Sequence, residues 1–403
     1  MVPRLYLRVT IGWVLVDEIR AAPEADEPRL VFADACAATD PERGELIALQ
    51  CAIERGGLAR DAAIAARRRV AKLASTHGVR WAGLDGLVER FEFRRGFVDS
   101  VSIDGDVFAA RGDELFERAP ALRRVELTGF VRAVDDGRDV PAARDELVPR
   151  AARAAEAPAM RRVRVLAVGS VYAAVRGSTG LAHPQPDAGT FASVLERFAS
   201  AGALARLEGL ALTAHPMLLG AVAEARQVAA LTDLELRDTS ERALSSLGRW
   251  FAPRRLSVRA TWPIEWPHVA ELAREATDLD LVVDPTPIPV DVRARLRRLG
   301  VEWSEDSRDA LAGDPAFGGL DELAITARKR HLPLDHLAMW RLLHAEHLQP
   351  RVLTLDVRLA ANAVAAIGAS PLARRLEVID LRGRWRAENR YVHDRGFAGI
   401  VLR

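Results

Sequence analysis

The stretch "LRRVELTG", residues Leu122–Gly129, shows the pattern that decides the fold. Apolar Val125 and Leu127 flank charged Glu126, and this alternation predicts a strand with one buried face. The same apolar–x–apolar core recurs along the chain, beginning at Val125, Val163, Leu210, Leu234, Leu256, Leu281, Val301, Leu323, Leu353, Ile379 and Ile400. Self-similarity at a steady period indicates a repeat architecture.

The spacing of these cores favours a solenoid over an ordinary α/β domain. From Leu210 onward the cores follow one another after 24, 22, 25, 20, 22, 30, 26 and 21 residues. All but one of these values lie within the range of about 20–29 residues found in leucine-rich repeats. A doubly wound α/β protein also alternates strand and helix, but each of its units needs about 30 residues or more.

Helical stretches are expected between the cores, at 191–200, 218–229, 240–250, 267–276, 291–300, 335–347 and 357–368. The gaps before Leu210 are longer, and residues 171–190, rich in Gly, Pro and Ser, are predicted to form an inserted loop. Each strand of a solenoid buries its apolar face only when its neighbours complete the core.

The sequence therefore predicts an α/β fold, a leucine-rich-repeat-like solenoid over residues 86–403. It is expected to form a horseshoe, with a parallel sheet on the concave face, helices on the convex face, and an α-helical cap domain at residues 1–85. The stretch "FEFRRGFVDSVSIDG", 91–105, is predicted to form the first strand. We expect Phe91, Phe93 and Phe97 to seal this end of the array against the cap.

Two helix starts are visible in the predicted cap domain. Pro28 follows Asp26 and Glu27, and Pro41 follows Asp40, whose carboxylate suits an N-cap position. Beyond Pro41, apolar residues recur at helical spacing, and residues 58–75 are also predicted to form a helix. The run of three arginines at 67–69 is expected to be a solvated helix face rather than a phosphate site.

The stretch "DEPRLVFADACAATDPERGELIALQ", 26–50, resembles the repeat-companion domain that precedes leucine-rich repeats in many bacterial proteins. The residues that carry the resemblance are Pro28, Arg29, Leu30, Ala33, Asp34, Asp40, Pro41, Glu42, Arg43, Glu45, Ile47, Leu49 and Gln50. The chain departs from that family at Ala35–Cys36, where Trp–Leu is preferred, and at Thr39, where glycine is preferred. The similarity extends over about residues 14–130, and the repeats that follow resemble the irregular, ribonuclease-inhibitor-like branch. The resemblance implies a shape and assigns no functional residue.

Composition and charge exclude several classes of function. The chain has 403 residues, 49% of them hydrophobic and 28% charged, and a net charge of +1, so no global field steers it to nucleic acid or to an anionic membrane. Cys36 and Cys51, the only cysteines, are expected to be buried free thiols rather than a disulfide scaffold or a zinc site. The apolar run Ile11–Val16 is too short to span a bilayer. We expect a soluble, cytoplasmic protein with no membrane partner.

The candidate binding surface is the predicted concave face, formed by residues that flank or separate the strand cores. These residues are Arg124, Glu126, Asp233, Glu235, Arg237, Arg255, Ser257, Arg259, Glu322, Thr354, Asp356, Asp380 and Arg382. Charges of both signs spread over many turns suit a protein or peptide better than a small metabolite, which prefers one deep apolar pocket. The sequence thus predicts a non-enzymatic interaction scaffold without a metal or cofactor.

Two C-terminal segments offer alternatives. One helical face carries His336, Trp340, His344 and His347, with His331 nearby. These residues suggest a metal-dependent enzyme as an alternative, although no HExxH motif is present. Residues 382–390, "RGRWRAENR", place four arginines around Trp385, a combination that grips single-stranded nucleic acid. The sequence contains neither a phosphate-binding glycine loop nor a nucleophile elbow.

Overall fold

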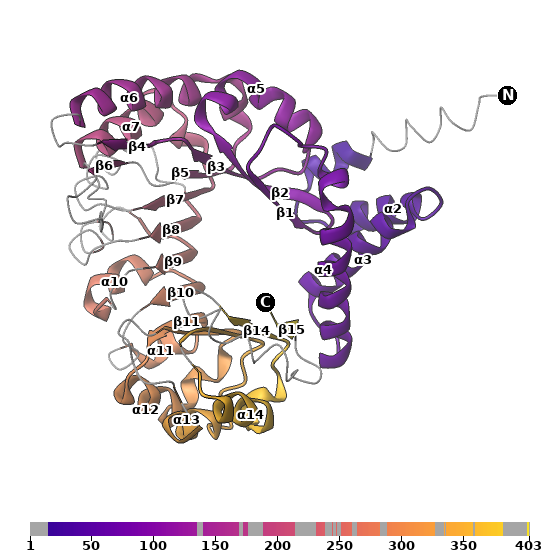
Figure 1. The fold of residues 1–403 in the computed structure, drawn as a ribbon, viewed down its shortest axis with the longest axis vertical. Coiled ribbons are helices and arrows are strands. Elements are labelled where there is room, and N and C mark those ends of the chain that lie inside the picture. Colours follow the sequence, from indigo (N-terminus) through magenta and orange to yellow (C-terminus); the bar gives the residue numbers. More distant parts are fainter. Residues whose placement is uncertain are drawn as a thin grey trace. The chain divides into compact units, whose positions relative to one another are not determined.

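The chain folds into two compact units of alternating strands and helices (Figure 1). The computed structural model describes residues 15–134, 140–168, 172–175, 188–213, 231–237, 244, 247, 251–259, 264–282, 288–326, 334, 336–357, 359–381 and 401–402. The first unit comprises Met1–Leu58 and Ala65–Ala230, and the second comprises Ala59–Ile64 and Leu231–Arg403. The boundary between units therefore lies near residue 230, whereas the sequence places one between the cap and the array at residue 85.

The N-terminal part of the first unit is helical, as predicted. A helix at 15–21 precedes α2 (Glu27–Cys36), α3 (Pro41–Arg55) and α4 (Arg60–Ala82). Asp40 is the N-cap of α3, and its side chain accepts a hydrogen bond from the Arg43 backbone N–H at 3.3 Å. Pro28 lies in the first turn of α2. The helix predicted at 58–75 extends seven residues further, to Ala82.

The stretch at 91–105 forms an antiparallel hairpin and not the single strand that the sequence predicts. Strand β1 (Arg90–Arg94) pairs with β2 (Phe97–Asp104), and β2 is the first strand of the parallel array. Gln50 of α3 holds the turn, because its Nε2 donates to the Phe93 carbonyl at 3.3 Å and its Oε1 accepts from the Gly96 N–H at 2.6 Å.

Aromatic residues of the hairpin pack against the helices, which supports the predicted seal. Phe97 meets Phe32 of α2 edge-on, with ring centroids 5.3 Å apart. The Arg43 guanidinium lies over Phe93, Phe97 and Trp81 at 5.2, 5.6 and 5.3 Å from the ring centroids. Burial lowers the pKa of Arg43 to about 10, since the surrounding side chains remove water from its charge.

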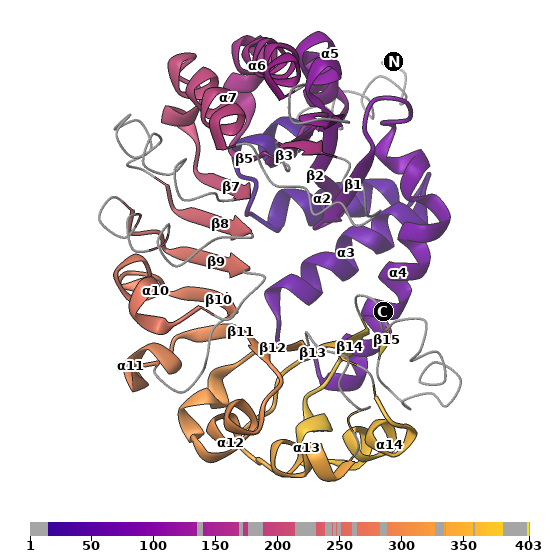
Figure 2. The same cartoon turned by 60° about the vertical axis from the view of Figure 1, so that its left-hand side comes forward.

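A parallel sheet follows in the first unit, in the order β2, β3, β5, β7. The strands β3 (Arg124–Thr128), β5 (Val165–Val168) and β7 (Gly209–Thr213) alternate with helices α5 (Gly105–Arg118), α6 (Val140–Glu156) and α7 (Ala188–Ser200). Short 3₁₀ helices, η2 (Pro158–Arg162) and η3 (Leu204–Arg206), precede β5 and β7. The helices α5, α6 and α7 lie together on one side of these strands (Figures 1 and 2).

A second, two-stranded sheet departs from the predicted loop. Strand β4 (Val131–Val134) pairs in parallel with β6 (Tyr172–Val175). The loop expected at 171–190 is therefore wrong at 172–175, which forms β6, and at 188–190, which begin α7. A run as short as β6 carries too few residues for periodicity to distinguish a strand from a loop. The remainder of 171–190 lies outside the described residues.

The second unit repeats the same construction. Its sheet runs in the order β8 to β15, and neighbouring strands in this order are parallel. The strands are β8 (Asp233–Arg237), β9 (Arg255–Arg259), β10 (Asp278–Val282), β11 (Leu296–Glu302), β12 (Glu322–Thr326), β13 (Val352–Asp356), β14 (Val378–Leu381) and β15 (Val401–Leu402). The helices are α10 (Trp266–Ala273), α11 (Val290–Arg293), α12 (Glu305–Gly313), α13 (His336–Leu343), α14 (Ala361–Ala369) and the 3₁₀ helices η4 (Pro315–Gly319) and η5 (Pro371–Arg374). The prediction of a parallel sheet with intervening helices is confirmed.

Three apolar residues at i, i+3 and i+5 mark most strands of the parallel sheets and the approach to each of them. Leu320, Leu323 and Ile325 are at most 1% exposed, so they form part of the core between sheet and helices. Equivalent buried triplets are Val98/Val101/Ile103, Leu122/Val125/Leu127, Val163/Leu166/Val168, Leu207/Leu210/Leu212, Leu231/Leu234/Leu236, Ala276/Leu279/Leu281 and Leu296/Leu299/Val301. The apolar residues that recur along the sequence are thus the residues that are buried in each repeat of the structure.

This register corrects three predicted strand starts. The core expected at Val163 begins at Leu166, and those expected at Leu281 and Val301 begin one alternation earlier, at Leu279 and Leu299. The other predicted cores that lie in described strands are confirmed, whereas Ile400 lies outside the described residues. At Val163, an apolar residue that leads into the strand was taken for the first core residue. At Leu281 and Val301, the second core residue was taken for the first.

Most of the predicted helices are present where the structure describes the chain. Helices α7, α10, α13 and α14 occupy the stretches predicted at 191–200, 267–276, 335–347 and 357–368. The helix predicted at 291–300 is wrong, because α11 ends at Arg293 and β11 begins at Leu296. Residues 218–229 lie outside the described part of the chain, as do all of 240–250 except Leu244 and Leu247, which are helical.

Two further expectations concern the burial of the cysteines and the lack of a membrane-spanning helix. Cys51 is buried and Cys36 is half-buried, and both are free thiols. Burial raises the pKa of Cys51 to about 11, so this thiol stays protonated near neutral pH. Among the helices that the structure describes, none has the length and apolar character needed to cross a membrane.

Candidate functional site

The candidate site in the second unit is the strand face opposite the buried triplets. Within β8, burial alternates, so Leu234 and Leu236 are buried while Asp233, Glu235 and Arg237 are partly exposed. Because paired parallel strands keep their register, side chains at matching positions form rows across the sheet. We call this surface of β8–β14 the open face.

The first row of the open face begins at the amino ends of the strands. Asp233 pairs in register with Arg255, and Arg255 with Asp278. The Arg255 Nε and terminal nitrogen donate to both Asp233 carboxylate oxygens at 2.6 Å. This row therefore alternates basic and acidic side chains that neutralise one another between strands.

The second row is predominantly acidic. Ser257 is in register with Glu235 and Asp280, and its hydroxyl donates to the Asp280 carboxylate at 3.2 Å. After a register shift between β10 and β11, the row continues through Arg298 and Glu322, which lie 3.4 Å apart. Thr354 of the neighbouring row donates its hydroxyl to Glu322 at 3.3 Å. Thr354 is paired in register with Asp380, and these two residues are only 6% and 8% exposed.

The third row lies at the carboxyl ends of the strands. Arg237 of β8 is in register with Arg259 of β9, and Arg237 also donates to Glu235 at 2.8 Å. Beyond it, Glu302, Thr326 and Asp356 form a separate row across β11–β13, because β10 and β11 pair after a register shift. The carboxyl ends of the strands are therefore basic on β8 and β9 and acidic on β11 and β13.

Most of the predicted site residues in the second unit thus share one face. The structure brings together Asp233, Glu235, Arg237, Arg255, Ser257, Glu322, Thr354, Asp356 and Asp380, and it places Arg259 on β9 in the same register. Arg382 lies outside the described residues. The set is therefore a contiguous surface of the second unit rather than scattered positions.

Arg124 and Glu126 occupy the matching positions of β3 in the first unit. Arg124 is in register with Ser100 and Val165, and Glu126 with Ser102 and Ala167. Arg90 of the hairpin lies 3.9 Å from Glu126. The neighbours on β5 and β7 are small or apolar, so the first unit does not continue the charged rows seen in the second.

Four charged residues of the open face were missed by sequence reasoning. Asp278 and Asp280 flank Leu279, while Arg298 and Glu302 flank the core of β11. The predicted start at Leu281 left Asp278 outside the core, and the helix predicted at 291–300 included Arg298. Asp280 and Glu302 lay beside or within the predicted cores and were not selected. The i, i+3, i+5 pattern of apolar residues would have found them.

Acidic residues predominate on the open face. Its alternating positions carry eight carboxylates, Asp233, Glu235, Asp278, Asp280, Glu302, Glu322, Asp356 and Asp380. They carry four arginines, Arg237, Arg255, Arg259 and Arg298. Among the described strands of this unit, acids therefore outnumber bases two to one, although the whole chain is close to neutral.

The histidine segment does not gather into a metal site where the structure describes it. The His344 ring lies 3.7 Å from that of Trp340, and its Nδ1 contacts the Trp340 carbonyl at 2.9 Å. His347 Nε2 contacts the Leu311 carbonyl at 3.0 Å, and His336 Nδ1 contacts Asn362 at 2.9 Å. In the described parts of the chain, no three His, Cys, Asp or Glu side chains lie close enough to hold a metal ion.

The other candidate segments give less. His331 and residues 382–390, including Trp385, lie outside the described residues. Comparison with known proteins adds no relative, because no family model matches the chain and no curated protein matches it significantly.

Proposed function

We propose that the chain is a non-enzymatic interaction protein that binds a protein or peptide partner on the open face of its second unit. The observation that carries the proposal is the contrast between the two sides of this sheet. One side is filled by buried leucine, isoleucine and valine triplets, and the other presents rows of ionic side chains in register. A broad surface of charged side chains suits a macromolecular partner that makes many shallow contacts.

The repeat pattern supports a leucine-rich-repeat-like solenoid as the fold behind this function. The buried i, i+3, i+5 triplets correspond to the L-x-x-L-x-L core of leucine-rich repeats. The described cores Leu234, Leu256, Leu279, Leu299 and Leu323 follow one another after 22, 23, 20 and 24 residues. The horseshoe shape, the cap domain and the relationship to repeat-companion proteins belong to this proposal.

The charge of the open face indicates the chemistry of its partner. With twice as many carboxylates as arginines, the face favours a segment rich in lysine and arginine. Electrostatic complementarity of this kind raises association rates and excludes acidic competitors. The proposed partner is therefore a basic protein surface or peptide.

Reversing charge on the open face is expected to abolish partner binding. In the double variant Asp278→Lys/Glu302→Lys, two partly exposed carboxylates become cations, which should weaken capture of a partner at least tenfold, about 1.4 kcal/mol. The tagged chain would be used for affinity capture from an extract of its native host, with quantitative mass spectrometry. Partners that are stoichiometric with the native chain should be lost with the variant.

A matched control separates the face from bulk charge. Glu271→Lys/Glu275→Lys makes the same change in net charge at exposed positions in and just after α10, away from the strands. This control should capture the partner as the native chain does. If the face variant keeps the partner, or if the control loses it equally, the open face is not the binding surface.

A further inference from the structure

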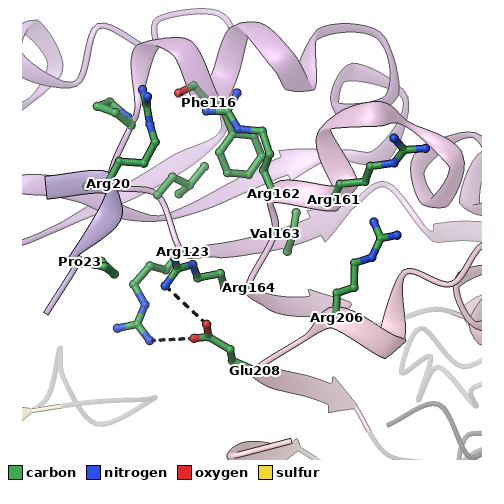
Figure 3. A pocket seen from close by; sticks show the side chains of 13 residues that line it. Arg20, Pro23, Phe116, Arg123, Arg161, Arg162, Val163, Arg164, Arg206 and Glu208 are labelled. Carbon is green, nitrogen blue, oxygen red and sulfur yellow. Dashed lines mark hydrogen bonds and ion pairs between the residues drawn. The ribbon is translucent and has the colours of Figure 1, made fainter. Parts of the chain in front are cut away.

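A separate pocket in the first unit collects arginines at the edge where the strands begin. It has a volume of about 380 Å³. Its walls are Arg20, Pro23, Phe116, Pro120, Ala121, Leu122, Arg123, Arg161, Arg162, Val163, Arg164, Arg206 and Glu208 (Figure 3). Six arginines and one glutamate therefore surround a space of the size that small ligands occupy.

The repeat itself gathers these arginines. Arg123, Arg164 and Glu208 each directly precede a strand, β3, β5 and β7, and their backbones continue the hydrogen bonding of the sheet. Arg161 and Arg206 come from the 3₁₀ helices η2 and η3 that lead into the same strands. Equivalent positions of successive repeats thus meet at one edge.

The pocket has an apolar base. Val163, Leu122 and Ala121 are 2%, 5% and 4% exposed, and Phe116 is 2% exposed. The Arg162 guanidinium lies 4.7 Å from the Phe116 ring centroid and donates to the Phe116 carbonyl at 3.2 Å. This packing fixes the direction of one cation at the rim.

Half of the arginines are neutralised within the protein. Arg164 and Arg123 lie 3.5 and 3.8 Å from Glu208, as Figure 3 shows, and Arg123 also pairs with Glu24. Arg20 pairs with Asp17 at 2.6 Å. These three cations have carboxylate partners and do not require a ligand.

The other three arginines differ, because they have no carboxylate partner among the described residues. Within that part of the chain, no acidic side chain lies within 4 Å of a nitrogen of Arg161, Arg162 or Arg206. Burial and the like charge of Arg20 lower the pKa of Arg162, against the opposite influence of Asp113 and Glu117. Three positive charges of the pocket lining are therefore left for a bound anion.

We propose that this pocket binds a small ligand that carries a diphosphate group. A diphosphate has about three negative charges near neutral pH, which matches the three unpaired guanidinium groups. Arginine is suited to phosphate because its planar fork donates two parallel hydrogen bonds. The apolar base adjoining the cations accommodates the uncharged part of such a ligand.

Calorimetric titration with inorganic pyrophosphate tests the proposal. The full-length chain would be titrated at an ionic strength of about 0.05 M, because exposed charges are strongly screened at higher salt. We expect one site per chain. The variant Arg161→Gln/Arg206→Gln should weaken binding at least tenfold, since each removed charge-assisted hydrogen bond contributes about 1.5 kcal/mol or more.

The control variant is Arg254→Gln/Arg375→Gln. These two exposed arginines lie outside the pocket, and their replacement changes the net charge by the same amount. The control should bind pyrophosphate within about twofold of the native chain. Equal weakening in both variants would overturn the proposal, since binding would then follow bulk charge.

Two further outcomes would also overturn it. One is the lack of any pyrophosphate binding by the native chain at millimolar concentration. The other is equally tight binding of citrate, a carboxylate anion of similar charge, which would show that phosphate chemistry is not recognised. Because the pocket belongs to the first unit, these outcomes leave the proposed partner binding on the open face of the second unit untouched.

Discussion

Replacing Gly96 with alanine is expected to lower the free energy of unfolding by about 3 kcal/mol. Gly96 has φ +83°, a left-handed conformation that costs an alanine about 1 kcal/mol. A Cβ at this position would also lie 2.8 Å from the Ile47 Cα, so backbone would have to move. Overpacking of this kind adds roughly 2 kcal/mol. Urea unfolding followed by circular dichroism measures the loss.

Gly57→Ala is the matched control for this substitution. Gly57 has φ +80°, nearly the same as Gly96, but an added Cβ would meet nothing within 4 Å. The control should lose only about 1 kcal/mol. Equal losses in the two variants would show that the hairpin turn does not pack against α3 as the structure has it.

Replacing Arg351 with alanine is expected to destabilise the second unit by about 3 kcal/mol. Its Nε and a terminal nitrogen donate to the two Glu377 carboxylate oxygens at 2.7 and 3.2 Å, and the Glu377 side chain is only 6% exposed. The hydrogen bonds with this carboxylate raise the pKa of Arg351. The substitution removes both hydrogen bonds from the buried carboxylate of Glu377. Thermal unfolding measures the effect.

Two comparisons isolate the buried pair. Arg297→Ala breaks an ion pair with Asp321, 3.8 Å apart and well exposed, and should change stability by less than about 0.5 kcal/mol. Adding Glu377→Gln to Arg351→Ala should recover about 1 kcal/mol, because a neutral amide is easier to bury than a carboxylate. A double variant that is less stable than Arg351→Ala would contradict this account.

The sequence predicted the construction of the sheet because its signal is repeated. One apolar–x–apolar core is weak evidence, but cores such as Leu210, Leu234 and Leu256 recur at a steady period, and the described strands begin beside them. The helices between them were equally predictable where apolar residues recur at helical spacing, as in α7. Repetition therefore compensates for the weakness of each local pattern.

The errors arise where strand and helix periods overlap. The run from Asp291 to Gly300 places Val292, Leu296 and Leu299 at spacings of four and three, which suits a helix. In the structure, pairing of β11 with both β10 and β12 overrides that local preference. Non-local strand pairing is not visible in one sequence.

The strand face that forms the candidate site was predictable from the sequence, but its excess of negative charge was not. Residues flanking a strand core face away from the core side, so Asp233, Glu235 and Arg255 could be assigned to one surface from alternation alone. The excess of carboxylates depends on Asp278, Asp280 and Glu302. Only the correct register places Asp278 on this face, whereas Asp280 and Glu302 already lay beside or within predicted cores. The arginine pocket joins the ends of different repeats, and such a meeting requires the folded sheet.

Carboxyl footprinting of the native chain bound to its captured partner tests the central claim most directly. A carbodiimide with an amine label modifies exposed carboxylates, and mass spectrometry locates them. Our account predicts that the partner protects Asp278, Glu302 and Glu322 on the open face severalfold, while Glu271 and Glu275, in and just after α10, stay equally reactive. Unchanged labelling of the open face, with protection confined to the helices, would contradict the account.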